Sequence, residues 1–221
     1  MHQACISTTS PELVVHLIES GCNPNLKDKY GYTPLHYACQ YVKLDIIQAL
    51  IKFSPAASTS SLSELTFTNN ESPLHLLIQF SNQSNSALIE KLVYLILLNG
   101  GCKSLALANK SQSQTPFEIA CDLGRLNIVE VILKFCAIQQ TNVDQLELLA
   151  SPNSQRYRLL NIISKYSVNS LHLASRNGHN DIIRLLLIYD VCDLNRLDVS
   201  NGCTALHEAS RYGKYFTLNL I

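Results

Sequence analysis

The chain lacks the features that mark several large classes of protein. Its 221 residues include no Trp and one Met, only 15% are charged, and Lys+Arg equals Asp+Glu at 17 each. Without a basic excess, the electrostatic attraction that supports nucleic-acid binding is missing, so no nucleic-acid partner is expected. No apolar run approaches the length of a membrane span, and residues 1–10 lack a signal-peptide pattern. We therefore expect a cytoplasmic protein with no membrane insertion.

Motifs of common active sites are missing as well. No G-x-G-x-x-G, P-loop, H-E-x-x-H or nucleophile elbow occurs in the sequence. Acidic residues such as Asp181 and Asp193 fall at separate, solvated positions of the pattern described below. The expectation is a protein that is not an enzyme, with no catalytic residues, no cofactor and no metal.

The chain does contain a sequence pattern that recurs several times. It reads GYTPLHYACQ at 31–40, ESPLHLLIQF at 71–80, NSLHLASRNG at 169–178 and CTALHEASRYG at 203–213, each followed by a second run rich in aliphatic residues. His172 and His207 are 35 residues apart, and His36 occupies the same slot. A fixed period of this length marks a repeat architecture. The T-P-L-H-x-A signature of the ankyrin repeat stands intact at 33–38, so the chain is identified as resembling ankyrin-repeat proteins.

The residues of one repeat explain its expected structure. Thr33 precedes Pro34 at the first helical turn, where a missing N–H costs nothing. In the following helix, the aliphatic residues at 46, 47, 50 and 51 form one buried stripe. One such unit cannot cover its own apolar face, so repeats stack on one another. The predicted fold is all-α: an ankyrin-repeat α-solenoid of helix–turn–helix units joined by short β-hairpin loops.

We expect about six repeats in one domain spanning 1–221, with truncated repeats at both ends and two insertions. The repeats fall at approximately 1–24, 25–53, 69–102, 110–136, 167–195 and 199–221, and the insertions at approximately 54–68 and 137–166. The second insertion contains two helix-like stretches and is interpreted as an extra helical excursion. Val42 stands where later repeats have Gly124, Gly178 and Gly213, so either this turn is remodelled or the repeat is locally weak. Since neither end has a polar cap, the chain is expected to be a piece of a longer protein.

Eight cysteines could indicate disulfides or zinc, but their positions follow the repeat and no C-x-x-C occurs. Six of them occupy two recurring slots, one in the first helix and one just after the second: Cys5, Cys39, Cys121, Cys22, Cys102 and Cys192. They are interpreted as small hydrophobic residues and free thiols, with Cys203 expected to be the most exposed.

Two sequence segments resemble one particular group of ankyrin-repeat proteins. GRLNIVE at 124–130 and HEASRYGK at 207–214 are similar to segments of the ankyrin-repeat and SAM-domain adaptors, the Odin-like group. This resemblance implies a cytoplasmic signalling adaptor linked to receptor tyrosine kinases, with SAM and phosphotyrosine-binding domains that this chain does not contain. Two alternatives stay open: a substrate-recognition array of a ubiquitin ligase, and the cytosolic repeats of a channel.

The candidate binding residues occupy variable positions of the first helices and the hairpin tips. Ankyrin arrays use this face for protein partners, and Tyr and Arg are enriched at binding hot spots. We expect a monomer that binds a protein partner through Tyr30, Tyr32, Tyr37, Tyr41, Arg176, Asn177, Glu208, Arg211 and Tyr212.

Overall fold

The protein is described here by a computed structural model that covers residues 1–7, 10–53, 62–81, 86–141, 163, 165, 169–198 and 201–221. Within these ranges all regular structure is helical and no β-strand occurs. The expected all-α fold of paired helices is confirmed. The chain divides into two compact units, Met1–Pro116 and Phe117–Ile221, each of which has its own buried core.

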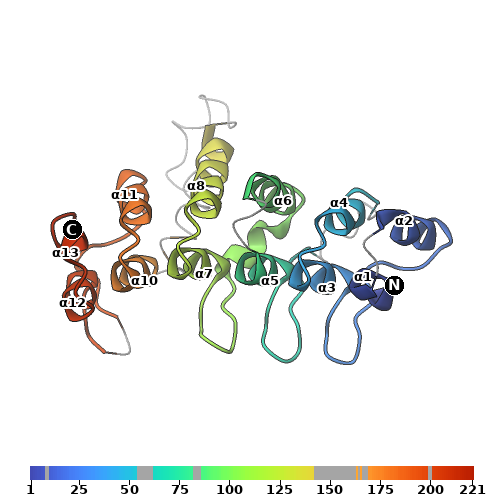
Figure 1. Ribbon diagram of the computed structural model, residues 1–221, viewed down its shortest axis with the longest axis horizontal. Helices are drawn as coiled ribbons and strands as arrows, with labels where there is room; N and C mark the ends of the chain where they lie inside the picture. Colours follow the sequence, from blue (N-terminus) through green and yellow to red (C-terminus); the bar gives the residue numbers. More distant parts are fainter. Residues whose placement is uncertain are drawn as a thin grey trace, which may run out of the picture. The chain divides into compact units, whose positions relative to one another are not determined.

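In the first unit, the first and second helices of successive repeats alternate along the chain. The first helices α1, α3 and α5 pack against one another, as do the second helices α2, α4 and α6. Loops project from this unit on the side away from the second helices (Figure 1). The helices are α1 (His2–Ser7), α2 (Pro11–Glu19), α3 (Pro34–Gln40), α4 (Leu44–Phe53), α5 (Pro73–Phe80), α6 (Ser86–Leu98) and the 3-10 helix η3 (Gly101–Ala106).

The second unit repeats the same pairing. Helix α10 packs against α11 and α12, α11 packs against α8, and α12 packs against α13. The helices are α7, which begins at the unit boundary (Pro116–Asp122), α8 (Leu126–Thr141), α10 (Ser170–Asn177), α11 (Asn180–Ile188), α12 (Ala205–Arg211) and α13 (Tyr215–Leu218).

A shared capping arrangement starts three of the first helices. Thr33 has extended backbone angles (φ −90°, ψ 164°) and Pro34 takes the first helical position. The ring of His36 then reaches back, and its Nδ1 accepts a hydrogen bond from the backbone N–H of Thr33 at 3.1 Å. This is the geometry of a capping box with His in the place usually held by Glu or Gln. Ser72 with His75, and Thr204 with His207, repeat it.

The loops between repeats close in a common way although none contains a strand within the described residues. A backbone N–H near the start of each loop donates to a carbonyl four or five residues later: Asp28 to Tyr32 at 2.9 Å, Thr66 to Glu71 at 3.0 Å, Asn109 to Gln114 at 2.9 Å and Asp198 to Cys203 at 2.8 Å. The expected hairpins are therefore present as hydrogen-bonded turns.

The turn at Val42 is not remodelled. Val42 has φ 51°, close to the φ of 68°, 76° and 65° at Gly124, Gly178 and Gly213. A β-branched residue in the left-handed region is strained by about 1–2 kcal/mol. Of the two alternatives in the sequence, the structure therefore supports a repeat with a locally strained turn.

Some elements differ from the expectation or lie beyond what is described. Helix α8 continues to Thr141, so the first residues assigned to the 137–166 insertion extend a second helix. The two helix-like stretches of that insertion fall outside the described residues except for Ile163 and Lys165, as does 54–61 of the other insertion. The 3-10 helix η3 was not predicted. The repeat boundaries themselves stay predictions.

Candidate protein-binding surfaces

The recurring histidine positions the loop of the following repeat. Because Nδ1 of His36 accepts the Thr33 N–H, its Nε2 carries the proton and lies 3.1 Å from the carbonyl oxygens of both Glu64 and Glu71. One imidazole thus holds both arms of the next loop. His2 makes the same pair of contacts with Leu26 and Tyr32, at 3.0 Å each.

The second unit contains the same clamp and two departures from it. His172 Nε2 lies 3.1 Å from the carbonyl of Arg196 and 3.0 Å from that of Cys203. Glu118 occupies the histidine slot in α7, where its buried carboxylate accepts the backbone N–H of Asn169 at 3.0 Å. His207 keeps its capping bond to Thr204, but its ring is exposed. The Nε2 atoms of His36 and His172 are thus engaged in contacts that hold the repeats together.

In the first unit, Asp28 organises the loop that carries the candidate tyrosines. Its Oδ1 accepts the backbone N–H groups of Tyr30 and Tyr32 at 2.9 Å each, and its Oδ2 accepts the hydroxyl of Tyr37 at 2.6 Å. Burial opposes ionisation, but these hydrogen bonds, led by that from Tyr37, lower the pKa of the Asp28 carboxyl overall. The carboxylate therefore stays charged and fixes the loop on α3.

The four candidate tyrosines divide into two pairs. The rings of Tyr32 and Tyr37 pack against each other with centroids 5.0 Å apart, and both side chains are partly buried. They are engaged within the protein. Tyr30 and Tyr41 are 48% and 50% exposed. These two are therefore the ones that a partner can cover.

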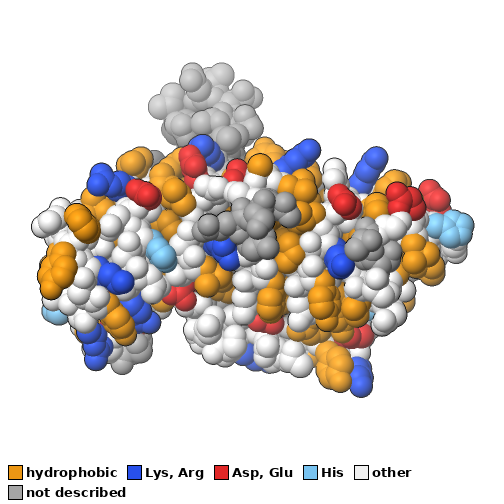
Figure 2. Space-filling view, in the orientation of Figure 1, with side chains coloured by type: hydrophobic (Ala, Val, Ile, Leu, Met, Phe, Trp, Pro, Cys, Tyr) orange, Lys and Arg blue, Asp and Glu red, His pale blue; other side chains and the backbone are white. Residues whose placement is uncertain are grey.

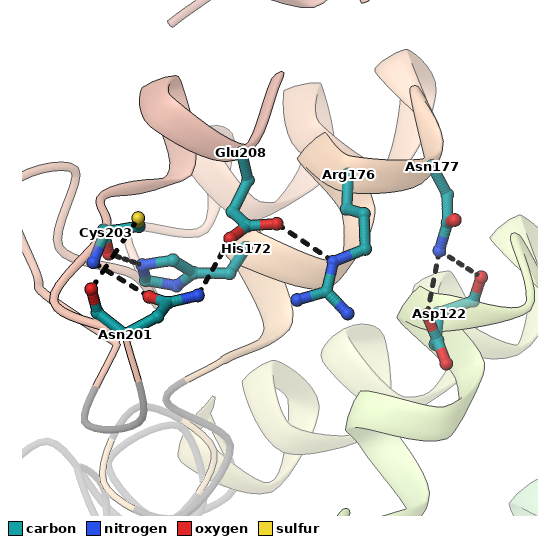
Figure 3. Close-up of polar contacts among 7 residues, drawn as sticks. All are labelled: Asp122, His172, Arg176, Asn177, Asn201, Cys203 and Glu208. Atoms are coloured by element: carbon teal, nitrogen blue, oxygen red, sulfur yellow. Dashed lines mark hydrogen bonds and ion pairs between the residues drawn. The ribbon is translucent and has the colours of Figure 1, made fainter. Parts of the chain in front are cut away.

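In the second unit, three of the candidate residues make polar contacts that join helices (Figure 3). The Nε of Arg176 in α10 donates to Oε2 of Glu208 in α12 at 2.9 Å. Glu208 is buried, and its Oε1 accepts from the side-chain amide of Asn201 at 3.1 Å. The hydrogen bond to Glu208 is the main reason why the pKa of the Arg176 guanidinium is raised. Glu208 thus lies beneath the surface and holds Arg176 in place.

The remaining candidates flank this pair. Asn177 donates from its amide to the carbonyl oxygen of Asp122 at 3.0 Å and to its carboxylate at 2.8 Å, which ties α10 to α7 (Figure 3). The ring of Tyr212 lies 5.7 Å from the guanidinium carbon of Arg176, a cation–π distance. Tyr212 is 51% exposed and Arg211 is also exposed, so these two side chains form the accessible part of the surface.

Sequence reasoning missed the partners that position these residues. Asp28, Asp122 and Asn201 were not singled out, although each fixes a candidate side chain or its loop. Asp28 precedes the turn glycine of its loop by three residues, and an Asp at such a position is a recognisable turn signal. Asn201 and Gly202 form a recognisable turn dipeptide, but no local signal predicts the bond of Asn201 to Glu208 or that of Asp122 to Asn177, 55 residues away.

No cluster of His, Cys, Asp and Glu suited to a metal ion occurs among the described residues. The eight cysteines are free, and four of them are buried: Cys5, Cys39, Cys121 and Cys136. The expectation for Cys203 was wrong, because it is half-buried while Cys22 is exposed. Cys203 lies against its own loop, where its thiol approaches the carbonyl oxygen of Asn201 at 3.8 Å.

Comparison with known proteins agrees with the repeat geometry. The family model described as ankyrin repeats (3 copies) matches residues 1–95 and 134–221, which is most of the chain. The chain belongs to the ankyrin-repeat family. Proteins of this family typically act as non-catalytic interaction domains, and repeat arrays of this kind bind other proteins on extended surfaces.

Two relatives and one solved structure illustrate the similarity. The chain is 25% identical over 213 residues to ankyrin repeat protein nuc-2 of Neurospora crassa, covering 96% of the chain and 16% of that protein. It is 28% identical over 189 residues to the mouse B-cell lymphoma 3 protein homolog, covering 85% of the chain and 34% of that protein. The crystal structure of the ankyrin repeat domain of Bcl-3, a member of the IkappaB family, superposes with a TM-score of 0.67 at 21% identity, covering 99% of the chain and 79% of that domain.

The chain therefore spans about a sixth of one of these relatives and about a third of the other. The structural match shows the fold alone. In the part of the chain that the structure describes, every helix is too short or too polar to cross a membrane.

Proposed function

We propose that the chain is a non-catalytic scaffold that binds a polypeptide segment on its loops and first helices. The observation that carries this proposal is the exposure of large aromatic side chains on elements that are themselves held rigidly. Tyr30 projects from a loop fixed by Asp28, and Tyr212 packs against an arginine fixed by Glu208. Rigid, exposed Tyr and Arg side chains lose little freedom on binding, which favours their use as anchors.

The narrower proposal is that this scaffold belongs to a cytoplasmic signalling adaptor linked to receptor tyrosine kinases. It rests on the resemblance of the 124–130 and 207–214 blocks to the ankyrin-repeat and SAM-domain adaptors. An array for ubiquitin-ligase substrates and the cytosolic repeats of a channel are the other two proposals. The sequence of the full-length transcript separates them: SAM and phosphotyrosine-binding domains favour the adaptor, a SOCS-type box the ligase, and membrane spans the channel.

A pull-down with two variants tests the candidate residues of both units. The test variant replaces Tyr30, Tyr41, Arg211 and Tyr212 by Ala, all of which are exposed. The control variant replaces exposed apolar residues of second helices instead, namely Leu13, Tyr94 and Ile188. Captured proteins are quantified by mass spectrometry, and the thermal unfolding of each variant is measured alongside.

We expect the test variant to lose the proteins that the natural sequence captures, and the control variant to keep them. Both should unfold within a few degrees of the natural protein, because exposed substitutions change stability by about 0.5 kcal/mol or less each. Retention of all partners by the test variant would mean that binding occurs elsewhere on the molecule. Equal losses in both variants would lead to the same conclusion.

A further inference from the structure

A groove runs between α2 and α4 in the first unit, on the second helices and therefore away from the surface proposed above. It has a volume of about 540 Å³. Its apolar lining includes Val15 from α2 with Ala49 and Phe53 from α4. Helix α2 has nine residues, so at 1.5 Å per residue the groove runs beside about 13 Å of helix, or between two and three turns.

One residue of α4 that lines the groove is smaller than its counterparts in other repeats. Ala49 directly precedes the buried Leu50, and the corresponding positions of α6, α8 and α11 hold Leu95, Val131 and Leu185. Each of those larger residues is partly buried, whereas Ala49 is 7% exposed and lines the groove with its single methyl group. The lining thus departs from the chain's own repeat pattern at one position.

The rim of the groove carries an excess of negative charge. Exposed carboxylates line it from both helices, and Figure 2 shows Asp and Glu side chains gathered over α2 and α4. Glu12 accepts a hydrogen bond from the hydroxyl of Ser10, which is the first cause of the lowered pKa of its carboxyl. The lining residues with formal charge at neutral pH are Glu12, Glu19, Asp45 and Lys52.

Lys52 offsets only part of this charge, because three carboxylates line the groove with one ammonium. Its ammonium lies 5.3 Å from the centre of the Phe53 ring, and no ion pair joins it to a carboxylate among the described residues. An apolar floor between charged edges, a few helical turns long, fits the way in which an amphipathic helix lies in a groove. Opposite charge across such an edge favours the correct partner and repels an acidic one.

We propose that the groove between α2 and α4 binds a basic amphipathic helix of a partner protein, whose aliphatic side chains enter beside Ala49 and whose Lys or Arg side chains meet Glu12, Glu19 and Asp45. This surface is independent of the one on the loops and first helices. A partner held on one surface leaves the other accessible, so the chain can join two proteins.

The test uses a defined probe, a synthetic helical peptide of about 14 residues with Leu on one face and Lys on the other, labelled with a fluorophore. Its Kd for the full chain is measured by fluorescence anisotropy at low and physiological salt. A second peptide carries Glu at every Lys position. We expect binding of the Lys peptide, weakening with salt, and little binding of the Glu peptide.

Three variants locate the binding. Ala49→Leu places the residue of the other repeats in the groove and should weaken binding by about tenfold or more. The variant Glu12→Gln with Glu19→Gln and Asp45→Asn leaves the packing intact and should weaken binding several-fold while reducing its salt dependence. The matched control, Glu90→Gln with Glu130→Gln and Asp181→Asn, removes the same number of acidic residues from the other second helices.

The proposal is overturned if the control variant weakens binding as much as the groove variant, because binding then follows general acidity. It is also overturned if the two peptides bind equally, or if neither binds. If Ala49→Leu disturbs folding, as judged by circular dichroism, the charge variant alone decides. The proposed loop surface is unaffected by any of these outcomes, since Tyr30, Tyr41, Arg211 and Tyr212 are unchanged in every variant.

Discussion

Arg176 donates a hydrogen bond at 2.9 Å to Glu208, a carboxylate that is only 1% exposed, and so ties α10 to α12. Removing one partner of a buried ion pair leaves the other charge in a poorly solvated site, which costs about 3–5 kcal/mol when both are fully buried. Arg176 is 35% exposed, so we expect Arg176→Ala to lower the free energy of unfolding by a smaller amount, about 2 kcal/mol. Urea denaturation measures this loss.

The double variant Arg176→Ala with Glu208→Gln is the control for that prediction. An amide in place of the carboxylate still accepts from Asn201 and no longer needs a cation, so the double variant should be more stable than Arg176→Ala alone. Glu208→Gln alone completes the cycle. If the effects of the two single variants add up to that of the double variant, the pair contributes nothing beyond its separate side chains and the interpretation of Glu208 as an anchor is wrong.

Val42 is the position where stability can be gained. Val42→Gly should raise the free energy of unfolding by about 1 kcal/mol, because relief of the left-handed strain at φ 51° outweighs the greater freedom of Gly in the unfolded chain. Gly213→Val is the converse test. Gly213 has φ 65° and a Cβ there would meet nothing within 4 Å, so its cost of about 1 kcal/mol would report the same balance of strain and unfolded-state freedom without a clash at Cβ. Destabilisation by Val42→Gly would contradict the argument.

The helices of the repeats were predictable because their signals are local. The Thr–Pro pair sets the start of α3, and the stripe at 46, 47, 50 and 51 sets the buried face of α4. The turn at Val42 was recognised from the glycines at equivalent positions, but the choice between remodelling and strain required backbone angles. A repeat pattern is informative here because each unit has nearly the same neighbours as the next.

The candidate surface was less predictable. Tyr30 and Tyr41 are exposed whereas Tyr32 and Tyr37 are partly buried. The spacing of these tyrosines in the sequence does not predict which pair is exposed. Glu208 looks like a surface residue in the sequence, yet Arg176 and Asn201 compensate its burial. The groove at Ala49 is formed by side chains of two helices that are about 30 residues apart in the sequence, so no local pattern marks it. Tertiary contacts decided these features, whereas the pattern decided the helices.

The thiols should differ in their rates of alkylation. Cys22 is exposed, whereas Cys5, Cys39, Cys121 and Cys136 are buried. Burial raises the pKa of the Cys5 thiol to about 11, and that of Cys192 to about 11, so little reactive thiolate forms at neutral pH. We expect iodoacetamide to modify Cys22 first in the native protein, as read by peptide mass spectrometry. Cys22→Ser should remove the fast phase without changing the melting temperature.

Reductant and EDTA provide the control for the thiol prediction. Neither should change the melting temperature, because the cysteines are free and no metal cluster occurs among the described residues. A lower melting temperature after addition of EDTA would show that a metal stabilises the fold. Rapid modification of Cys39 in the native protein would show that α3 opens readily.

The buried histidines predict loss of stability in mild acid. Burial lowers the pKa of His36 to about 4 and that of His75 to about 4, from an ordinary value of 6.5. The unfolded chain therefore binds more protons than the folded protein between these values, so stability is complete above pH 6.5 and falls as the pH drops towards 4. The expected loss at the acid end is roughly 3 kcal/mol for each histidine.

Urea midpoints measured at intervals between pH 7.5 and 4.5 test this prediction. His36→Gln should lower stability at pH 7.5, because the Gln side chain cannot reproduce both the cap on Thr33 and the clamp on Glu64 and Glu71, and it should also flatten the fall with pH. His207→Gln is the matched control. His207 has the same cap but an exposed ring, so the variant should keep the full pH dependence. If His36→Gln leaves the slope unchanged, other groups cause the acid instability.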